Sequence, residues 1–260
     1  MDTSDSRISF DEKGQCSHCY SFKSAATNLK NRKLSQEEIF SNIREKGKDK
    51  EYDCILGLSG GLDSSYLALL AKEYNLKPLV IHVDAGWNSD ISVQNIRRVC
   101  DYCNFDLHTY VIEWDVIKRL HRAMLASGVA NQDVVQDHIF FSTLYKNARK
   151  HNIKTVLNGS NHATEGINVA SWQHSSIDAI SIRDIFKKFG HGSLEGYELM
   201  SFFSYYFKIP FIDKLQVVNP LDYSIYNKKE AQERLKHELD FVTYEKKHGE
   251  SRFTMFFRNH

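Results

Sequence analysis

The sequence predicts an α/β fold built on a doubly wound parallel sheet. Short apolar runs alternate along the chain with stretches whose apolar residues have helical spacing. The runs are apolar throughout, which is typical of parallel strands that helices cover on both faces. A glycine-rich loop joins the first run to the first strongly periodic helix, as in many α/β proteins that bind ligands at strand ends.

The first half of the chain supplies the first βαβ unit. A weak helical stretch at 37–45 precedes an apolar run at 53–58, which breaks at Ser59-Gly60-Gly61. From Asp63 onward the apolar residues mark one face of a helix, and another apolar run follows at 79–83. Strand, helix and strand in this order predict two parallel neighbours.

The alternation continues to the end of the chain. Helical spacing is seen at 96–103, 117–124, 137–150 and 182–189, and strands are expected at 107–112, 155–157 and 215–218. Asn227 with Glu230 predicts an N-cap for a last helix that ends near residue 239. The aromatic-rich piece at 202–207 is either core or a partner surface.

Length and composition favour one main domain. A chain of 260 residues with 42% apolar residues can bury one sizeable core. We expect a loop-rich N-terminal appendage at 1–35, the main domain at 36–225 and a C-terminal helical segment at 226–260.

Charge and cysteine content point to a cytoplasmic protein without a polyanionic partner. The net charge is +1, so no strong field indicates nucleic-acid binding. No stretch reaches the roughly 18 apolar residues of a membrane span, and the first residues are polar. Five cysteines, an odd number, fit a reducing compartment better than a disulfide framework.

The loop from Ser59 to Ser65 carries the expected chemistry. Its two glycines let backbone N–H groups approach an anion, and the helix that follows adds its positive dipole. The loop lacks the Gly-Lys-Ser/Thr ending of a Walker A motif, so hydroxyls stand where that motif has a lysine. A Gly-rich turn capped by Asp63 is the simpler alternative for a bare Ser-Gly-Gly.

The full string resembles the PP-loop signature S-G-G-x-D-S of the ATP pyrophosphatases, matched at Ser59, Gly60, Gly61, Asp63 and Ser64. That resemblance implies an adenine-nucleotide α-hydrolase-like fold. It also implies ATP with its pyrophosphate in this loop, held by these residues and Ser65, and release of pyrophosphate as AMP is transferred to a substrate oxygen.

Nearly the whole chain also resembles the N-acetyl sugar amidotransferases of bacterial surface-polysaccharide (O-antigen) and flagellar-glycan biosynthesis. The ordered strings that carry this resemblance are Met1-Asp-Thr-Ser-Asp5, Phe10-Asp with Cys16-Ser-His-Cys19, 57–66, 82–88, Asn158 to Asn161 with Ala163 to Gly166, Ser171-Trp172 and 244–253. The family implies conversion of an acetamido group on a nucleotide-linked sugar to an acetamidino group. It further implies ammonia from a separate glutaminase with a cyclase-like companion, since no glutaminase motif is visible here.

The expected nucleotide site lies at the carboxyl ends of the strands. Asp63 is the carboxylate expected near Mg²⁺, and Asp84 should lie beside the nucleotide, with capping of the following turn as its alternative. Gly159, Ser160 and Asn161 end another strand at the same edge and could complete the phosphate site, although a plain turn explains them equally well.

Further candidates follow from the family positions. Asp137, beside His138, is a candidate for metal or substrate binding, and a helix cap is the simpler explanation. Thr164, Glu165 and Trp172 match the region expected to meet the sugar. Arg252 is the candidate phosphate or sugar-nucleotide ligand in the C-terminal charged run, which is otherwise typical of a solvated helix face.

The two ends of the chain depart from the family pattern. Cys16 and Cys19 have the spacing of half a zinc site. The family carries another Cys pair ahead of the Met that begins this chain, and Cys100 and Cys103 look like core. The family's basic C-terminal portion is also missing, so we expect a truncated or divergent member. The alternatives are a tRNA-thiolating PP-loop enzyme and a non-catalytic ATP-binding partner.

Overall fold

Five parallel strands form the centre of the molecule. The computed structural model describes residues 2–32, 34–167, 175–244 and 249–259. Its strands are β1 Cys54–Gly57, β2 Pro78–Asp84, β3 Leu107–Val111, β4 Thr155–Leu157 and β5 Gln216–Val218, in the order β3-β2-β1-β4-β5. Each neighbouring pair is parallel. The predicted doubly wound α/β sheet is therefore confirmed.

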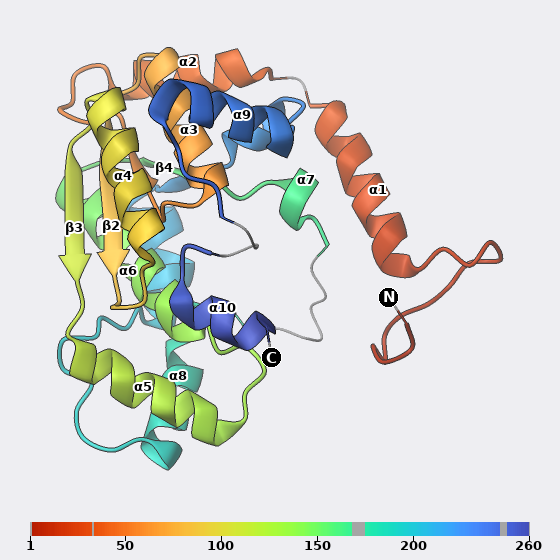
Figure 1. Ribbon diagram of the computed structural model, residues 1–260, viewed down its shortest axis with the longest axis vertical. Coiled ribbons are helices and arrows are strands. Elements are labelled where there is room, and N and C mark those ends of the chain that lie inside the picture. The colour runs from red at the N-terminus through yellow and green to blue at the C-terminus, as the bar shows by residue number, and fades with distance from the viewer. Residues whose placement is uncertain (1, 33, 168–174, 245–248, 260) are drawn as a thin grey trace.

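Helices cover both faces of this sheet (Figure 1). Successive strand residues point to opposite faces, and each face has its own core. Leu56 and Leu157 belong to the core shared with α3 (Leu62–Glu73), α4 (Asp90–Cys103) and α9 (Lys228–Leu239). Ile55 and Val156 belong to the opposite core, shared with α6 (Val134–Lys150).

The remaining helices lie around this three-layer body. α2 (Gln36–Gly47) begins with a capping box between Ser35 and Glu38. α5 (Trp114–Ser127) packs with α8 (Ala179–Phe189) in a core that also includes Val135 and Ile139 of α6. The short helix α7 (His162–Glu165) follows β4, and α10 (Arg252–Asn259) lies in front of the sheet in Figure 1.

The N-terminal segment differs from its prediction. Residues 1–35 are expected to be loop-rich, but Ser17–Lys30 form α1, a helix that extends away from the sheet (Figure 1). The Cys16 thiol caps it by accepting from the Cys19 backbone N–H. The helix has no buried residue, so no apolar periodicity could have revealed it. The domain boundaries at 35 and 225 remain predictions.

The aromatic-rich segment forms a π-helix, η1 (Ser204–Ile212). Ile209 and Tyr205 join the core, whereas Phe202, Phe203 and Phe207 are exposed. The segment is thus partly core and partly surface, and a partner for it remains a prediction.

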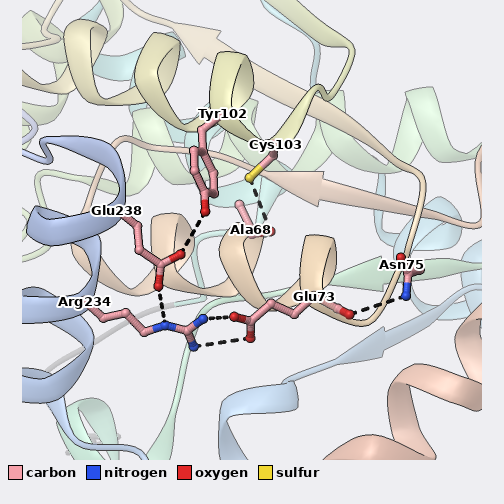
Figure 2. A network of polar contacts seen from close by, with 7 residues as sticks. All are labelled: Ala68, Glu73, Asn75, Tyr102, Cys103, Arg234 and Glu238. Atoms are coloured by element: carbon pink, nitrogen blue, oxygen red, sulfur yellow. Dashed lines mark hydrogen bonds and ion pairs between the residues drawn. The ribbon is translucent and has the colours of Figure 1, made fainter.

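Polar contacts fix α9 against α3 and α4 (Figure 2). The Arg234 guanidinium of α9 donates to Glu73 of α3 at 3.2 Å and to Glu238 at 2.7 Å. Glu238 in turn accepts from the Tyr102 hydroxyl of α4 at 3.0 Å. Tyr226, in the segment between the 3₁₀ turn η2 (Pro220–Tyr223) and α9, packs against the same core as α3.

Membrane crossing is not a property of the helices seen here. None within the described residues is both long and apolar enough to span a bilayer.

The central strand should dominate stability. We expect Leu56→Ala, which empties a fully buried position of β1, to lower the free energy of unfolding by about 2–5 kcal/mol in urea denaturation. Ile225→Ala is the control, because Ile225 is 95% exposed and its truncation should change that free energy by less than about 0.5 kcal/mol. Equal effects of the two variants would contradict the assigned core.

Candidate active site

The loop between β1 and α3 has the geometry of an anion site. Gly60 has φ +78°, a conformation that favours glycine, and a Cβ there would lie 2.6 Å from the Ser92 carbonyl oxygen. Gly61 is the N-cap of α3 and no side chain caps the helix. The first N–H groups of α3 therefore keep their capacity to bind an anion, supported by the helix dipole.

Two serine hydroxyls stiffen this loop. The Ser59 and Ser64 hydroxyl oxygens lie 3.1 Å apart, and the Ser59 hydroxyl accepts from the Gly61 N–H at 3.3 Å. Both serines line the main cavity with Gly61 and Asp63. Ser65 differs, because it is 0% exposed and its side chain points into the protein. Its predicted contact with nucleotide would require a local rearrangement.

The loop after β4 packs directly on this site. A Cβ on Gly159 would lie 3.0 Å from the Ser64 backbone nitrogen, so a side chain there would require the two loops to move apart by a few tenths of an ångström. Gly159 and Ser160 line the same cavity. The sequence analysis expected these two loops at one edge, and β1 and β4 are indeed paired neighbours.

Asn161 has a different task from the phosphate contact that the sequence suggested. It is buried, its side-chain oxygen caps α7 by accepting from the Thr164 N–H at 3.0 Å, and its amide nitrogen donates to Asp63 at 3.3 Å. An amide committed to these partners orients the carboxylate of Asp63.

The Asp63 carboxylate accepts hydrogen bonds from three side chains. Its Oδ2 accepts from Asn161 and from the Thr164 hydroxyl, each at 3.3 Å. Its Oδ1 accepts from the Tyr226 hydroxyl, which comes from the segment between η2 and α9. Sequence reasoning missed Tyr226, and no spacing signal exists for a contact between residues so far apart in the chain.

The other two candidate carboxylates, Asp84 and Asp137, lie in different places. Asp84 accepts from the Gly86 N–H at 2.8 Å, the turn-capping alternative, and is not among the described residues that line the cavity. Asp137 does line the cavity. The alternative role of Asp137 as a helix cap is wrong, because α6 begins at Val134 and its N-cap position is Asp133, and its role in metal or substrate binding remains a prediction.

His138 is a structural residue. Its Nδ1 lies 2.8 Å from the Ser176 carbonyl oxygen and its Nε2 accepts from the Met200 N–H at 2.9 Å. Burial lowers its pKa, and the ring is satisfied as the neutral tautomer with hydrogen on Nδ1. His138 is thus fixed in place while the neighbouring Asp137 lines the cavity.

The remaining candidates are Thr164, Glu165, Trp172 and Arg252. Thr164 and Glu165 line the cavity, as expected for residues that meet a substrate. Trp172 lies outside the described residues. Arg252 is largely exposed and its guanidinium pairs with Asp90 at 3.1 Å, so in this structure it serves a surface ion pair.

The C-terminal segment covers the loop in a way that the sequence did not reveal. The Tyr244 hydroxyl donates to the Gly60 carbonyl at 2.7 Å, and the backbone of Ser89 donates to Glu250 at 3.0 Å. Glu250 lines the cavity close to Gly61. Residues 244–253 carry a family resemblance in the sequence, and among their described residues Tyr244 and Glu250 make these contacts.

The resulting cavity is large and has many polar side chains in its lining. Its volume is about 920 Å³, near the upper end of the roughly 300–1,000 Å³ of small-molecule sites. Ser59, Gly61, Asp63 and Ser64 of the loop line one part of it. The lining also includes Asn131, Asp133, Gln136 and Asp137, with Glu250 and Ser251 from the C-terminal segment. The cavity has room for a second substrate beside the loop.

The donor set fits magnesium and does not fit zinc. Mg²⁺ is commonly held by one or two carboxylates together with phosphate oxygens, and Asp63 offers an oxygen ligand beside the anion site. Zinc needs four closed ligands. Within the described residues no group of three or more His, Cys, Asp or Glu side chains is arranged for a metal, so Cys16 and Cys19 offer only half a set.

Cys100 and Cys103 are core residues, as the sequence suggested. Both are buried on α4, and burial raises the pKa of the Cys100 thiol to about 12 and that of Cys103 to about 11. Thiols with such pKa values are poor nucleophiles and metal ligands at neutral pH.

Comparison with known proteins agrees with this geometry. Residues 50–166, which include the loop, α3 and β4, match the model of the asparagine synthase family. The matched segment is less than half of the chain and contains the whole Ser59-Gly60-Gly61-Leu62-Asp63-Ser64 string. Its position in the chain coincides with both walls of the anion site, and no curated protein matches the chain.

Several solved structures resemble the fold at low identity. The ammonia-dependent NAD synthetase of Campylobacter jejuni subsp. jejuni NCTC 11168, in complex with nitrate, is 16% identical over 85% of this chain and 99% of its own, with a TM-score of 0.40. The NMN synthetase of Francisella tularensis is 18% identical over 86% and 98%, with a TM-score of 0.38. A predicted subunit of tRNA methyltransferase from Methanocaldococcus jannaschii DSM is 14% identical over 70% and 73%, with a TM-score of 0.39.

A substitution at Gly60 tests the loop geometry. We expect Gly60→Ala to weaken ATP binding strongly, because the added Cβ meets the Ser92 carbonyl and the residue must keep a positive φ. Isothermal titration calorimetry with ATP measures the effect. Gly128→Ala is the matched control, since Gly128 has φ +68° and open space around its Cβ. Equal loss of affinity in both variants would mean that the effect is one of general stability.

A second feature near the site is a buried histidine. His121 of α5 lies against Phe253 of α10 with ring centroids 3.9 Å apart, and against Trp87 at 5.8 Å. Neither of its ring nitrogens has a hydrogen-bond partner within the described residues. Burial lowers its pKa to about 4, because a charged ring would be desolvated there.

Acid should therefore destabilise the protein partly through His121. An unfolded chain takes up this proton near pH 6.5 and the folded chain only near pH 4, so the free energy of unfolding falls between these values as the pH drops. The slope is about 1.4 kcal/mol per pH unit for one proton. We expect His121→Phe to reduce it in denaturant titrations at several pH values, and the exposed His237→Phe to leave it unchanged. Identical slopes for His121→Phe and wild type would refute this assignment.

Proposed function

We propose that this protein is an ATP-dependent amidotransferase that converts the acetamido group of a nucleotide-linked N-acetyl sugar to an acetamidino group. The observation that carries the proposal is the Ser-Gly-Gly-x-Asp-Ser loop in the lining of a cavity that also contains several carboxylate and amide side chains. A loop of this kind suits the pyrophosphate of ATP. A lining with carboxylates and amides suits a substrate rich in hydroxyls.

The chemistry needs ATP because an amide oxygen leaves poorly. The acetamido oxygen attacks the α-phosphorus of ATP, and the bond from that phosphorus to the bridging oxygen breaks, which releases pyrophosphate. Ammonia then attacks the imidate carbon, AMP departs with the former amide oxygen, and the added nitrogen loses a proton. The first step turns the amide oxygen into part of a good leaving group, and the second step expels it as AMP.

The residues of the chain would act mainly through electrostatics. Charge develops on the departing pyrophosphate, and the first N–H groups of α3 with the Ser59 and Ser64 hydroxyls are positioned to stabilise it. Magnesium, held by Asp63 and phosphate oxygens, would neutralise part of that charge. Asp137, Thr164 and Glu165 would bind the sugar or receive the proton.

The ammonia source and the cellular setting are part of the proposal. A separate glutaminase with a cyclase-like companion would supply ammonia, and the product would enter bacterial surface-polysaccharide or flagellar-glycan synthesis in the cytoplasm. The proposal rests here on the family resemblance of the sequence.

The cysteines argue against the thiolating alternative. Enzymes that transfer sulfur to tRNA commonly use catalytic cysteines. All five cysteines of this chain are described, and none lines the cavity. A binding partner without activity remains the competing function and is separated by the following measurement.

The direct test is pyrophosphate and AMP release from MgATP with ammonium chloride and a panel of UDP-linked N-acetyl sugars. We expect release that depends on one sugar and falls by about 10²–10³-fold in Asp63→Ala, by analogy with loss of one charge-stabilising group. Asp101→Ala, on the exposed side of α4, is the control. ATP binding without turnover on any sugar would favour the binding partner, and absence of ATP binding would reject the proposal altogether.

A further inference from the structure

Three donors from two separate segments hold the Asp63 carboxylate. Asn161 and Thr164 come from the start of α7, and Tyr226 comes from the segment that precedes α9. A carboxylate has about four positions for accepting hydrogen bonds. With three of them used, one position on Oδ1 remains for another partner.

Tyr226 is itself held in a fixed place. Its ring lies 5.8 Å from that of Tyr66, a residue of the same helix that carries Asp63. Asn227, the next residue, caps α9, and α9 is bound to α3 through Arg234 and Glu73 (Figure 2). The hydroxyl of Tyr226 and the backbone of Asp63 therefore belong to one rigid unit.

The chemistry of the phenol suits a permanent donor. A carboxylate can only accept hydrogen bonds, and the phenol hydroxyl has one hydrogen to donate, so the hydroxyl of Tyr226 donates to the Asp63 carboxylate that it faces.

We propose that Tyr226 is a positioning residue, which fixes the orientation of Asp63 so that a single oxygen position faces a divalent cation bound with ATP. The inference rests on the proposed function, because it concerns the metal expected with that nucleotide. Tyr226 would act through Asp63 and would not contact the substrate itself.

The physical benefit is preorganisation. A free aspartate loses side-chain rotamer freedom when it binds a metal, whereas Asp63 has already lost it in the folded chain. Groups that orient a metal ligand typically change metal affinity by about 10- to 100-fold when they are removed. A structural role alone would change thermal stability without a selective effect on the metal.

The test measures metal affinity directly. Mn²⁺ replaces Mg²⁺, and electron paramagnetic resonance reports free Mn²⁺ during titration of the full chain with a non-hydrolysable ATP analogue. We expect Tyr226→Phe to weaken Mn²⁺ binding by about 10-fold or more, while affinity for the analogue in EDTA stays unchanged. In turnover, the Mg²⁺ concentration for half-maximal rate should rise more than kcat falls.

Matched variants separate positioning from folding. Tyr223→Phe removes a hydroxyl three residues earlier, where the ring stacks with Arg32, and should leave Mn²⁺ affinity as in wild type. Thr164→Val removes another donor to Asp63 and Thr164→Ser retains it. If Tyr226→Phe does not fold, these two variants test whether the donors that hold Asp63 set the metal affinity. We expect weaker Mn²⁺ binding in the valine variant alone.

Two outcomes would overturn the inference. One is wild-type Mn²⁺ affinity in a folded Tyr226→Phe protein, and the other is equal affinity in the valine and serine variants. Failure of the wild-type chain to bind the ATP analogue would instead reject the proposed function.

Discussion

The pairing of β1 with β4 is the constraint on which the site depends. Strands β1 to β3 are added in one direction from the centre and β4 and β5 in the other, so the strand order reverses between β1 and β4. Helices leave from the two sides of this point, and the loops after the two strands meet there. At this point Gly159 of one loop packs against the backbone of Ser64, which follows the other strand. If β1 and β4 were not neighbours, the anion site would have one wall.

Residues late in the chain contact Asp63 and the anion-binding loop. Tyr226 reaches Asp63, Tyr244 reaches the Gly60 carbonyl, and Glu250 lies close to Gly61. These contacts place two donor hydroxyls and the carboxylates of Asp63 and Glu250 around an anion-binding loop. Such a combination is unfavourable for phosphate alone and becomes favourable when a divalent cation lies between the two sets of negative charges. The arrangement of negative charges therefore agrees with Asp63 as an oxygen ligand of a divalent cation.

Buried histidines show how the fold uses titratable groups near the site without making them reactive. His82 has its Nδ1 2.9 Å from the Leu58 carbonyl and its Nε2 3.0 Å from the Asn88 amide, and burial lowers its pKa. His82 thereby ties the end of β1 to the loop after β2. His121 differs because it packs against the rings of Trp87 and Phe253 and its ring nitrogens have no hydrogen-bond partner among the described residues, which makes it a source of acid sensitivity.

The sequence by itself determined the parallel sheet, the helix after the loop and the PP-loop, because continuous apolar runs, helical spacing and the Ser-Gly-Gly-x-Asp-Ser string are local signals. It could not determine α1, which buries no side chain and so leaves no apolar pattern. It also placed Ser65 and Asn161 at the phosphate, where the structure commits one to the interior and the other to Asp63. The direction of each side chain within a motif, and the arrival of Tyr226 and Tyr244 from distant segments, depend on how the helices pack on the sheet. Only the tertiary structure decides them, since hydrogen bonds between residues far apart in the chain have no periodicity to read.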